Sequence, residues 1–195
     1  MRPLGPLVRL QIQRASLKTG ARPHRTYDPA PLVAVPRLAV GPDGVLGAGP
    51  QDAWIVDVHH RAHPATKNAD GLHGISVGFT AHYEAMRERF GERLTIGCAG
   101  ENLIAEAGGR LQLADVAGGL AVLAPDGRER VRLRVLEVAR PCRPFTGWAL
   151  GGGGRTVEAE VLKQSLQFLD EGVRGFYCTA EGMGTVEVGD LLVAL

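Results

Sequence analysis

The sequence predicts a mainly β fold with a few helices (α+β), organised as a closed or partly open β-barrel. Short segments in which apolar and polar residues alternate recur along most of the chain, and turn-forming glycine, proline and aspartate separate them. Only two segments carry apolar residues at helical spacing. Many short strands combined with two helices are typical of small β-barrels.

The first two expected strands lie before residue 41. Val8, Leu10 and Ile12 alternate with polar residues, which predicts a half-buried strand. A second apolar run spans residues 32–40 and is interrupted by Pro36. Because proline cannot donate a hydrogen bond within a sheet, this run is expected to be an edge or bulged strand. A Gly-Pro-Asp-Gly turn signal leads from it to the next element.

Residues 54–59 predict a further strand, again because apolar and polar residues alternate. Successive side chains of a strand point to opposite faces, so Asp57 and His59 are expected on the face opposite Trp54. For the same reason, at most one of His59 and His60 can share a face with Asp57.

The second half of the chain predicts a hairpin and a closing strand. The strand at residues 131–135 alternates up to a Pro-Cys dipeptide, and a Pro-Asp-Gly turn at residues 125–127 joins it to the apolar run at 120–123. Residues 185–195 predict the last strand.

Two amphipathic helices are expected. The first spans residues 80–90, with Gly91 as its C-cap, and the second spans about residues 157–170. Four consecutive glycines at residues 151–154 precede the second helix, and they predict either a flexible linker or a gate over a site.

Composition and length exclude several classes of protein. The 195 residues suit a single domain over residues 1–195, and the net charge of +1 offers no footprint for nucleic acid. Three cysteines without a CxxC pair argue against a disulfide framework or a structural zinc site, and they favour a reducing compartment. No apolar run is long enough for a membrane helix or a signal peptide core, so we expect a cytoplasmic protein that does not bind membranes.

The heptapeptide ARPCRPF, which directly follows the strand at 131–135, contains the most informative residue, Cys142. Its prolines end the strand and stiffen the corner. The neighbouring Arg140 and Arg143 favour the thiolate, which can bind a thiophilic metal or take part in sulfur transfer. The alternative is a cysteine that acts as a small buried apolar residue, which is what we expect of Cys98 and Cys178.

The further polar residues that are candidates for binding are Asn102, Glu101 and Arg174. The Asn102 amide can reach a buried polar group, or the Glu101–Asn102 turn can simply orient the next strand. Arg174 lies in a predicted strand between glycines that allow a close backbone approach. It suits bidentate binding of a phosphate or carboxylate, or a structural ion pair to Glu101 or Asp190. Asp190 is expected to organise the final turn.

Taken in order, four segments resemble the MOSC family, whose domains are similar to the C-terminal part of molybdenum-cofactor sulfurase. They are GENL at residues 100–103, the strand that ends in Pro-Cys, RGFY at 174–177 and GTVEVGD at 184–190. The DVH at residues 57–59 also resembles the family's early GD-x-H motif, although Val56 stands where glycine is expected and His60 and Arg61 replace small residues. The resemblance covers the chain from about residue 8 to its end.

The resemblance implies a barrel related to the small barrel domain of pyruvate kinase and a site for molybdenum cofactor (molybdopterin). Cys142 is then the catalytic residue. It either ligates the molybdenum, as in the amidoxime-reducing members, or carries a persulfide sulfur. The residues expected to bind the cofactor are Asn102, Glu101, Arg174, Arg140, Arg143, Asp57 and His59.

The resemblance also implies partners, because this chain contains no pyridoxal-phosphate site and no flavin or iron–sulfur segment. Pyridoxal phosphate would enter only through a separate cysteine desulfurase, and electrons through a separate flavin or iron–sulfur reductase. Two other classes of function stay open: a non-catalytic carrier of the cofactor, and a metallohydrolase that uses Asp57 and nearby histidines. The sequence does not decide whether the protein is an enzyme.

Overall fold

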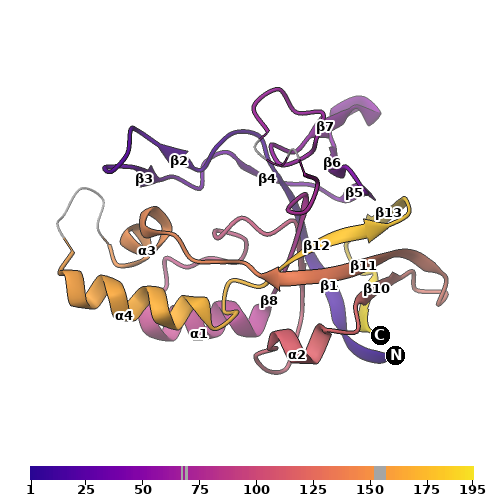
Figure 1. The fold of residues 1–195 in the computed structure, drawn as a ribbon. Coiled ribbons are helices and arrows are strands. Elements are labelled where there is room, and N and C mark those ends of the chain that lie inside the picture. The colour runs from indigo at the N-terminus through magenta and orange to yellow at the C-terminus, as the bar shows by residue number, and fades with distance from the viewer. Residues whose placement is uncertain (67, 69, 152–156) are drawn as a thin grey trace.

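The computed structural model describes the whole chain except residues 67, 69 and 152–156. Within the described residues, seven strands form a closed mixed barrel (Figure 1). These strands are β1 (Arg2–Gln13), β8 (Ile75–Phe79), β9 (Leu103–Ala105), β10 (Leu120–Leu123), β11 (Glu129–Val138), β12 (Phe176–Glu181) and β14 (Leu191–Ala194). Their order around the barrel is β14-β10-β11-β12-β8-β9-β1, and β1 pairs with β14 to close it. The β8–β9 pair is parallel and the others are antiparallel. The prediction of a mainly β barrel is therefore confirmed.

The remaining strands extend the barrel at one side. β4 (Leu32–Ala34) pairs with the end of β1. A four-stranded sheet has the order β13-β5-β6-β7, and a two-stranded hairpin joins β2 to β3. The bounds are β2 (Lys18–Thr19), β3 (Thr26–Tyr27), β5 (Arg37–Gly41), β6 (Gly44–Ala48), β7 (Trp54–Val56) and β13 (Gly184–Glu187).

The described residues form four α-helices and a short 3-10 helix: α1 (Thr80–Phe90), α2 (Leu113–Val116), α3 (Arg143–Ala149), α4 (Ala159–Asp170) and η1 (Pro50–Asp52). Figure 1 shows α1 and α4 together at one end of the barrel, with α3 between them and the β2–β3 hairpin. No helix in the described part of the chain is long and apolar enough to cross a membrane.

Two apolar cores stabilise this arrangement. One fills the barrel and includes Leu10, Val77 and Leu133, each at most 1% exposed. The other lies between the barrel end and the helices, where Tyr83 of α1 and Phe145 of α3 are fully buried. Burial of large apolar side chains is the main favourable term in folding, so this second core holds α3 and its N-terminus in place.

The structure differs from the predicted strands at several points. The run at 32–40 divides at Pro36 into β4 and β5, and the run at 185–195 divides into β13 and β14. Asp190 does organise the turn between the last two, because its Oδ2 accepts a hydrogen bond from the Glu187 backbone N–H at 2.8 Å. β7 ends at Val56, so Asp57 and His59 lie beyond the strand and not on one of its faces.

Several elements escaped prediction, among them β8, α3, the short strands β2 and β3, and α2. All five residues of β8 are buried, so the alternation that marks a half-exposed strand is missing. α3 contains both Pro144 and Gly147, which lower helix propensity. Proline is tolerated in this helix because it lies in the first turn, where the backbone N–H has no partner within the helix. The first predicted helix is confirmed, and the second begins at Ala159 instead of 157. The predicted gate at 151–154 lies, except for Gly151, outside the described residues.

Candidate functional site

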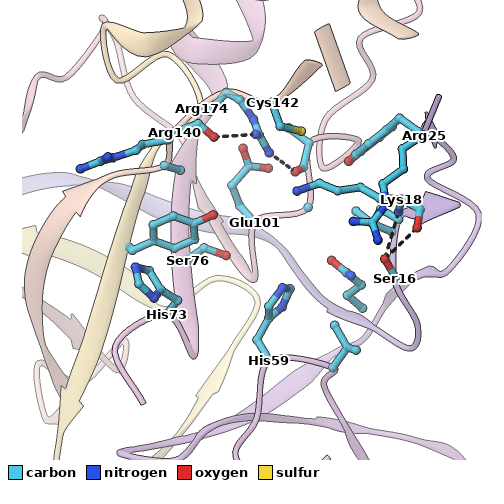
Figure 2. Close-up of a pocket in the computed structure, with 18 of the residues that line it drawn as sticks. Ser16, Lys18, Arg25, His59, His73, Ser76, Glu101, Arg140, Cys142 and Arg174 are labelled. Atoms are coloured by element: carbon cyan, nitrogen blue, oxygen red, sulfur yellow. Dashed lines mark hydrogen bonds between the residues drawn. The ribbon is translucent and has the colours of Figure 1, made fainter. Parts of the chain in front are cut away.

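A cavity of about 300 Å³ opens between the β2–β3 hairpin and the wall of the barrel (Figure 2). Its wall comes from segments far apart in the sequence, which include the hairpin, the loop after β7, the loop before β9, the segment after β11 and the loop before β12. The polar and ionisable residues that line it are Gln13, Ser16, Lys18, Arg22, Arg25, Tyr27, His59, His73, Ser76, Glu101, Arg140, Cys142, Arg174 and Tyr177.

Cys142 lies at the N-terminus of α3 as its N-cap residue, half-buried and on the cavity wall. Its backbone is extended, and its carbonyl accepts hydrogen bonds from both the N–H and the Oγ1 of Thr146, each at 3.0 Å. The rigid corner expected at this position is therefore the start of a helix. Cys98 and Cys178 are buried, as predicted.

The two arginines that flank Cys142 in the sequence are placed differently. Arg140 lines the cavity, and its Nη2 donates a hydrogen bond to Glu137 Oε2 at 3.1 Å. Arg143 is the exposed first residue of α3 and does not line the cavity. Of the three arginines predicted to bind the cofactor, Arg140 and Arg174 share the cavity wall with the thiol.

Arg174 lies in the loop before β12, not in a strand as predicted. Its Nη2 donates a hydrogen bond to the Ala99 carbonyl at 2.7 Å and its Nη1 donates to the Arg140 carbonyl at 3.2 Å. The guanidinium carbon lies 4.5 Å from the centroid of the Phe145 ring, at cation–π distance. Its Nε is buried without a hydrogen-bond partner among the described residues.

The surroundings of Arg174 keep its guanidinium protonated. Burial lowers the pKa of Arg174, but the charges of Tyr27, Tyr177, Cys142 and Glu101 together outweigh burial and leave that pKa raised. Arg174 therefore keeps a permanent positive charge beside Cys142. The glycines around it allow the close backbone approach that was predicted: a Cβ on Gly175 would lie 2.1 Å from the Val77 carbonyl oxygen.

Glu101 is only 3% exposed, yet it forms part of the cavity wall. Its Oε2 accepts a hydrogen bond from the Tyr83 hydroxyl. Burial raises the pKa of the Glu101 carboxyl, and the opposing influences of Arg174 and Tyr83 do not cancel this rise. Glu101 is therefore protonated more readily than an ordinary glutamate.

Asp57 and Asn102 lie behind the cavity wall and do not line it. The fully buried Asp57 accepts hydrogen bonds from the Gln13 N–H at 2.6 Å, the His59 N–H at 2.8 Å and Asn102 Nδ2 at 3.2 Å. Asn102 Oδ1 accepts from the Ser76 N–H at 3.0 Å. Both side chains are thus engaged by the protein and act as a framework, which matches the alternative that the Glu101–Asn102 turn orients a strand.

His59 is the member of this group that reaches the cavity. Its Nδ1 lies 3.1 Å from Asp57 Oδ1, which orients the ring. His60 and His63 serve local turns instead, since each Nδ1 accepts a hydrogen bond from a backbone N–H two residues on, at 3.1 Å. Among the described residues, no group of three or more His, Cys, Asp or Glu side chains could hold a metal ion. The described part of the chain thus offers no support for the metallohydrolase alternative.

The basic residues of the cavity wall that were not among the predicted site residues are Lys18, Arg22, Arg25 and His73. His73 Nε2 lies 3.0 Å from Glu137 Oε1, and the His73 ring packs edge-on against Tyr177 with centroids 4.9 Å apart. Lys18, Arg22 and Arg25 all lie within an eight-residue polar segment, residues 18–25. That local density of positive charge was the one available signal, and the overall charge of +1 concealed it.

Comparisons with known proteins agree with this fold. A family model described as MOSC domain matches residues 73–193. The YuaD protein from Bacillus subtilis has a crystal structure with a TM-score of 0.56 and 13% identity, covering 98% of this chain and 94% of that chain. YiiM from Geobacillus stearothermophilus gives a TM-score of 0.56 and 18% identity, with 99% and 75% covered. YiiM from Escherichia coli gives 0.51 and 14%, with 84% and 64% covered.

No curated protein matches the sequence of this chain. The identities to the solved structures are too low to transfer more than the fold. The family model, in contrast, spans well over half of the chain and includes Cys142, Glu101 and Arg174. From this match and the closed mixed barrel, we conclude that the chain belongs to the MOSC domain family.

Proposed function

We propose that this chain binds molybdenum cofactor in the cavity, with the Cys142 thiol facing the metal end of the ligand. The observation that carries the proposal is the placement of Cys142 and Arg174 on the same cavity wall, where a soft sulfur lies beside a permanent cation. MOSC domains are linked to molybdenum cofactor binding or to sulfurase function, and a thiol on the cavity wall suits either role.

The chemistry of the cavity fits a ligand that is both soft and anionic. A cysteine sulfur suits a thiophilic metal. Five lysine or arginine side chains line the cavity, and Glu101 is its single carboxylate among the described residues, with a raised pKa. The buried Nε atoms of Arg174 and Arg25 have no hydrogen-bond partner among the described residues, so donors remain for a ligand. When bound, the cofactor would supply a metal centre for two-electron chemistry.

The residues of this chain would then bind, orient and shield the ligand. Cys142 supplies the sulfur, Arg174 the adjacent charge, and His59, held by Asp57, a polar group on the cavity wall. Asn102 and Asp57 hold the wall itself. In a reductase of N-hydroxylated compounds, two electrons and two protons would convert the N–OH group to N–H and water, and a separate flavin or iron–sulfur protein would supply the electrons.

In sulfur carriage, the Cys142 thiolate would attack the outer sulfur of a persulfide on a separate, pyridoxal-phosphate-dependent cysteine desulfurase. A new S–S bond would form on Cys142, and the desulfurase thiolate would leave. Both routes use the same cavity residues, so the structure of the cavity does not distinguish between them. The presence of cofactor is therefore the first property to test.

Metal and pterin content of the purified protein tests the proposal. Wild type and Cys142→Ser are expressed in a molybdenum-replete host that makes the cofactor and are analysed by mass spectrometry. We expect wild type to carry both pterin and molybdenum, and the serine variant to carry less of both, because a serine oxygen is a poor soft ligand and the contact to the metal end of the cofactor is lost. Cys178→Ala, which removes a thiol from the barrel core, is the matched control and should resemble wild type.

A wild-type protein without pterin, or a serine variant loaded like wild type, would overturn the proposal. The same samples separate the two routes. An added sulfur atom on the Cys142 peptide indicates sulfur carriage, whereas turnover of an N-hydroxylated base with an added reductase indicates the reductase. Loaded protein that shows neither indicates a carrier.

A further inference from the structure

The cation predicted to bind a phosphate is already engaged by the protein. Both terminal nitrogens of Arg174 donate hydrogen bonds to backbone carbonyls, and its guanidinium lies against Phe145. Bidentate binding of a phosphate uses two nitrogens on one edge of the guanidinium, and each edge of Arg174 includes a terminal nitrogen that already donates to the backbone, although its Nε has no partner among the described residues. The phosphate-binding role therefore falls to cations that the protein itself does not use.

Three such cations lie on the β2–β3 hairpin. Lys18, Arg22 and Arg25 all line the cavity, and within the described part of the chain no hydrogen bond or ion pair engages their side-chain nitrogens. The Nε of Arg25 is even buried without a partner. Buried donors are normally satisfied, so an unpaired one beside a cavity indicates a missing acceptor.

The hairpin is firmly attached to the element that carries the thiol. The Tyr27 ring packs against Phe145 and Trp148 of α3, with centroid distances of 5.1 and 5.5 Å, and the Tyr27 hydroxyl donates a hydrogen bond to the Cys98 carbonyl at 2.7 Å. α3 begins immediately after Cys142. The hairpin cations and the thiol are thus parts of one packed unit, which favours a single ligand or two adjoining ligands.

Figure 2 shows Lys18 and Arg25 on one side of the cavity and Arg140 on the other, with Cys142 and Arg174 along the wall between them. A ligand whose soft atom meets Cys142 would reach the hairpin with another part of its structure. Unpaired lysine and arginine side chains recognise phosphate groups through charge-assisted hydrogen bonds.

We propose that Lys18, Arg22 and Arg25 form a phosphate subsite, in which the hairpin binds the phosphate monoester of a ligand whose other end lies at Cys142. This inference extends the proposed function and rests on it for the other half of the ligand. The phosphate could belong to the cofactor or to a phosphorylated substrate, since both present the same doubly charged group.

The subsite is tested with inorganic pyrophosphate as the probe, in protein from a host that makes no molybdopterin. Isothermal titration compares wild type with Arg25→Gln and with Lys18→Gln/Arg25→Gln. Arg14→Gln is the matched control, because it removes the same charge from an exposed residue four positions before Lys18 that does not line the cavity. Thermal unfolding checks that each variant folds like wild type.

We expect wild type to bind pyrophosphate, Arg25→Gln to bind about tenfold more weakly, and the double variant more weakly still, because charge-assisted contacts are lost. Binding by wild type should also weaken as salt is raised, whereas Arg14→Gln should match wild type. A wild type that does not bind, or a double variant that binds as wild type does, overturns the subsite.

A second titration with cofactor-loaded wild type identifies the source of the phosphate. Exclusion of pyrophosphate assigns the subsite to the cofactor, and continued binding assigns it to a phosphorylated substrate. The two proposals can also fail separately. Protein that never carries pterin but binds pyrophosphate through the hairpin removes the cofactor role alone, whereas loaded protein whose apo form binds no pyrophosphate removes the subsite alone.

Discussion

The Asn102 side chain donates a hydrogen bond from Nδ2 to Oδ2 of Asp57, 3.2 Å away, and so joins two segments that lie 45 residues apart in the sequence. Neither side chain lines the cavity, although both belong to segments whose sequences resemble MOSC motifs. Their bond fixes the loop after β7 to the loop before β9. The wall of the cavity therefore depends on residues that no ligand needs to touch.

Asp57→Asn should destabilise the protein by roughly 2–4 kcal/mol, because the amide cannot accept all the hydrogen bonds that the buried carboxylate accepts. Chemical denaturation measures the loss. Asp43→Asn, which affects only an exposed ion pair with Arg61, is the control and should cost at most about 0.5 kcal/mol. Equal stability of the two variants would show that Asp57 does not hold the wall.

Cys142 should be alkylated faster than either of the other cysteines. It is half-buried on the cavity wall, whereas burial raises the pKa of both Cys98 and Cys178 to about 12 and keeps them as unreactive thiols. Iodoacetamide labelling near neutral pH, followed by peptide mapping, measures the order. Equal labelling of the three cysteines in the native protein would contradict it.

Gly175→Ala should destabilise the protein by roughly 2–4 kcal/mol and displace Arg174. The new Cβ would lie 2.1 Å from the Val77 carbonyl oxygen, and the backbone φ of +78° already disfavours a side chain. Gly182→Ala is a matched control, since φ is +105° there but no atom lies within 4 Å of the added Cβ. The control should lose only about 1 kcal/mol in thermal or chemical unfolding. A similar loss in both variants would mean that backbone strain, and not the approach to β8, decides the effect.

The stability of the protein should respond to the titration of Glu101. Its folded-state pKa lies above its ordinary value of 4.5, because burial outweighs the influences of Arg174 and Tyr83. The folded state then binds more protons than the unfolded state between these two pKa values, so stability falls as pH rises through that window. Glu101→Gln removes this proton linkage.

The Glu101→Gln variant should therefore gain stability relative to wild type as pH rises from about 4.5. Urea unfolding of both proteins from pH 4.5 to 8 measures the difference between their free energies of unfolding. A difference that stays constant with pH, or that changes in the opposite direction, would refute the raised pKa.

The spacing of apolar residues along the sequence was sufficient to predict several elements of the fold. The alternation around Val8 and Ile12 predicts part of β1, and the apolar spacing at 80–90 predicts α1 with its observed bounds. β8 could not be predicted in this way, because a strand buried on both faces shows no alternation. α3 also escaped, since the packing of Phe145 and not helix propensity stabilises it.

The same division applies to the site. Sequence alone is enough to place Cys142 at a proline-bounded corner after a strand, because proline acts on the backbone next to it. Which cations remain available to a ligand depends instead on the folded chain. Arg174 contacts Ala99 and Phe145, two residues that are distant from it in the sequence. Arg25 lines the cavity, and folding brings no hydrogen-bond partner to its Nε among the described residues. Charge availability is a property of packing, since a cation is free only where folding brings no acceptor to it.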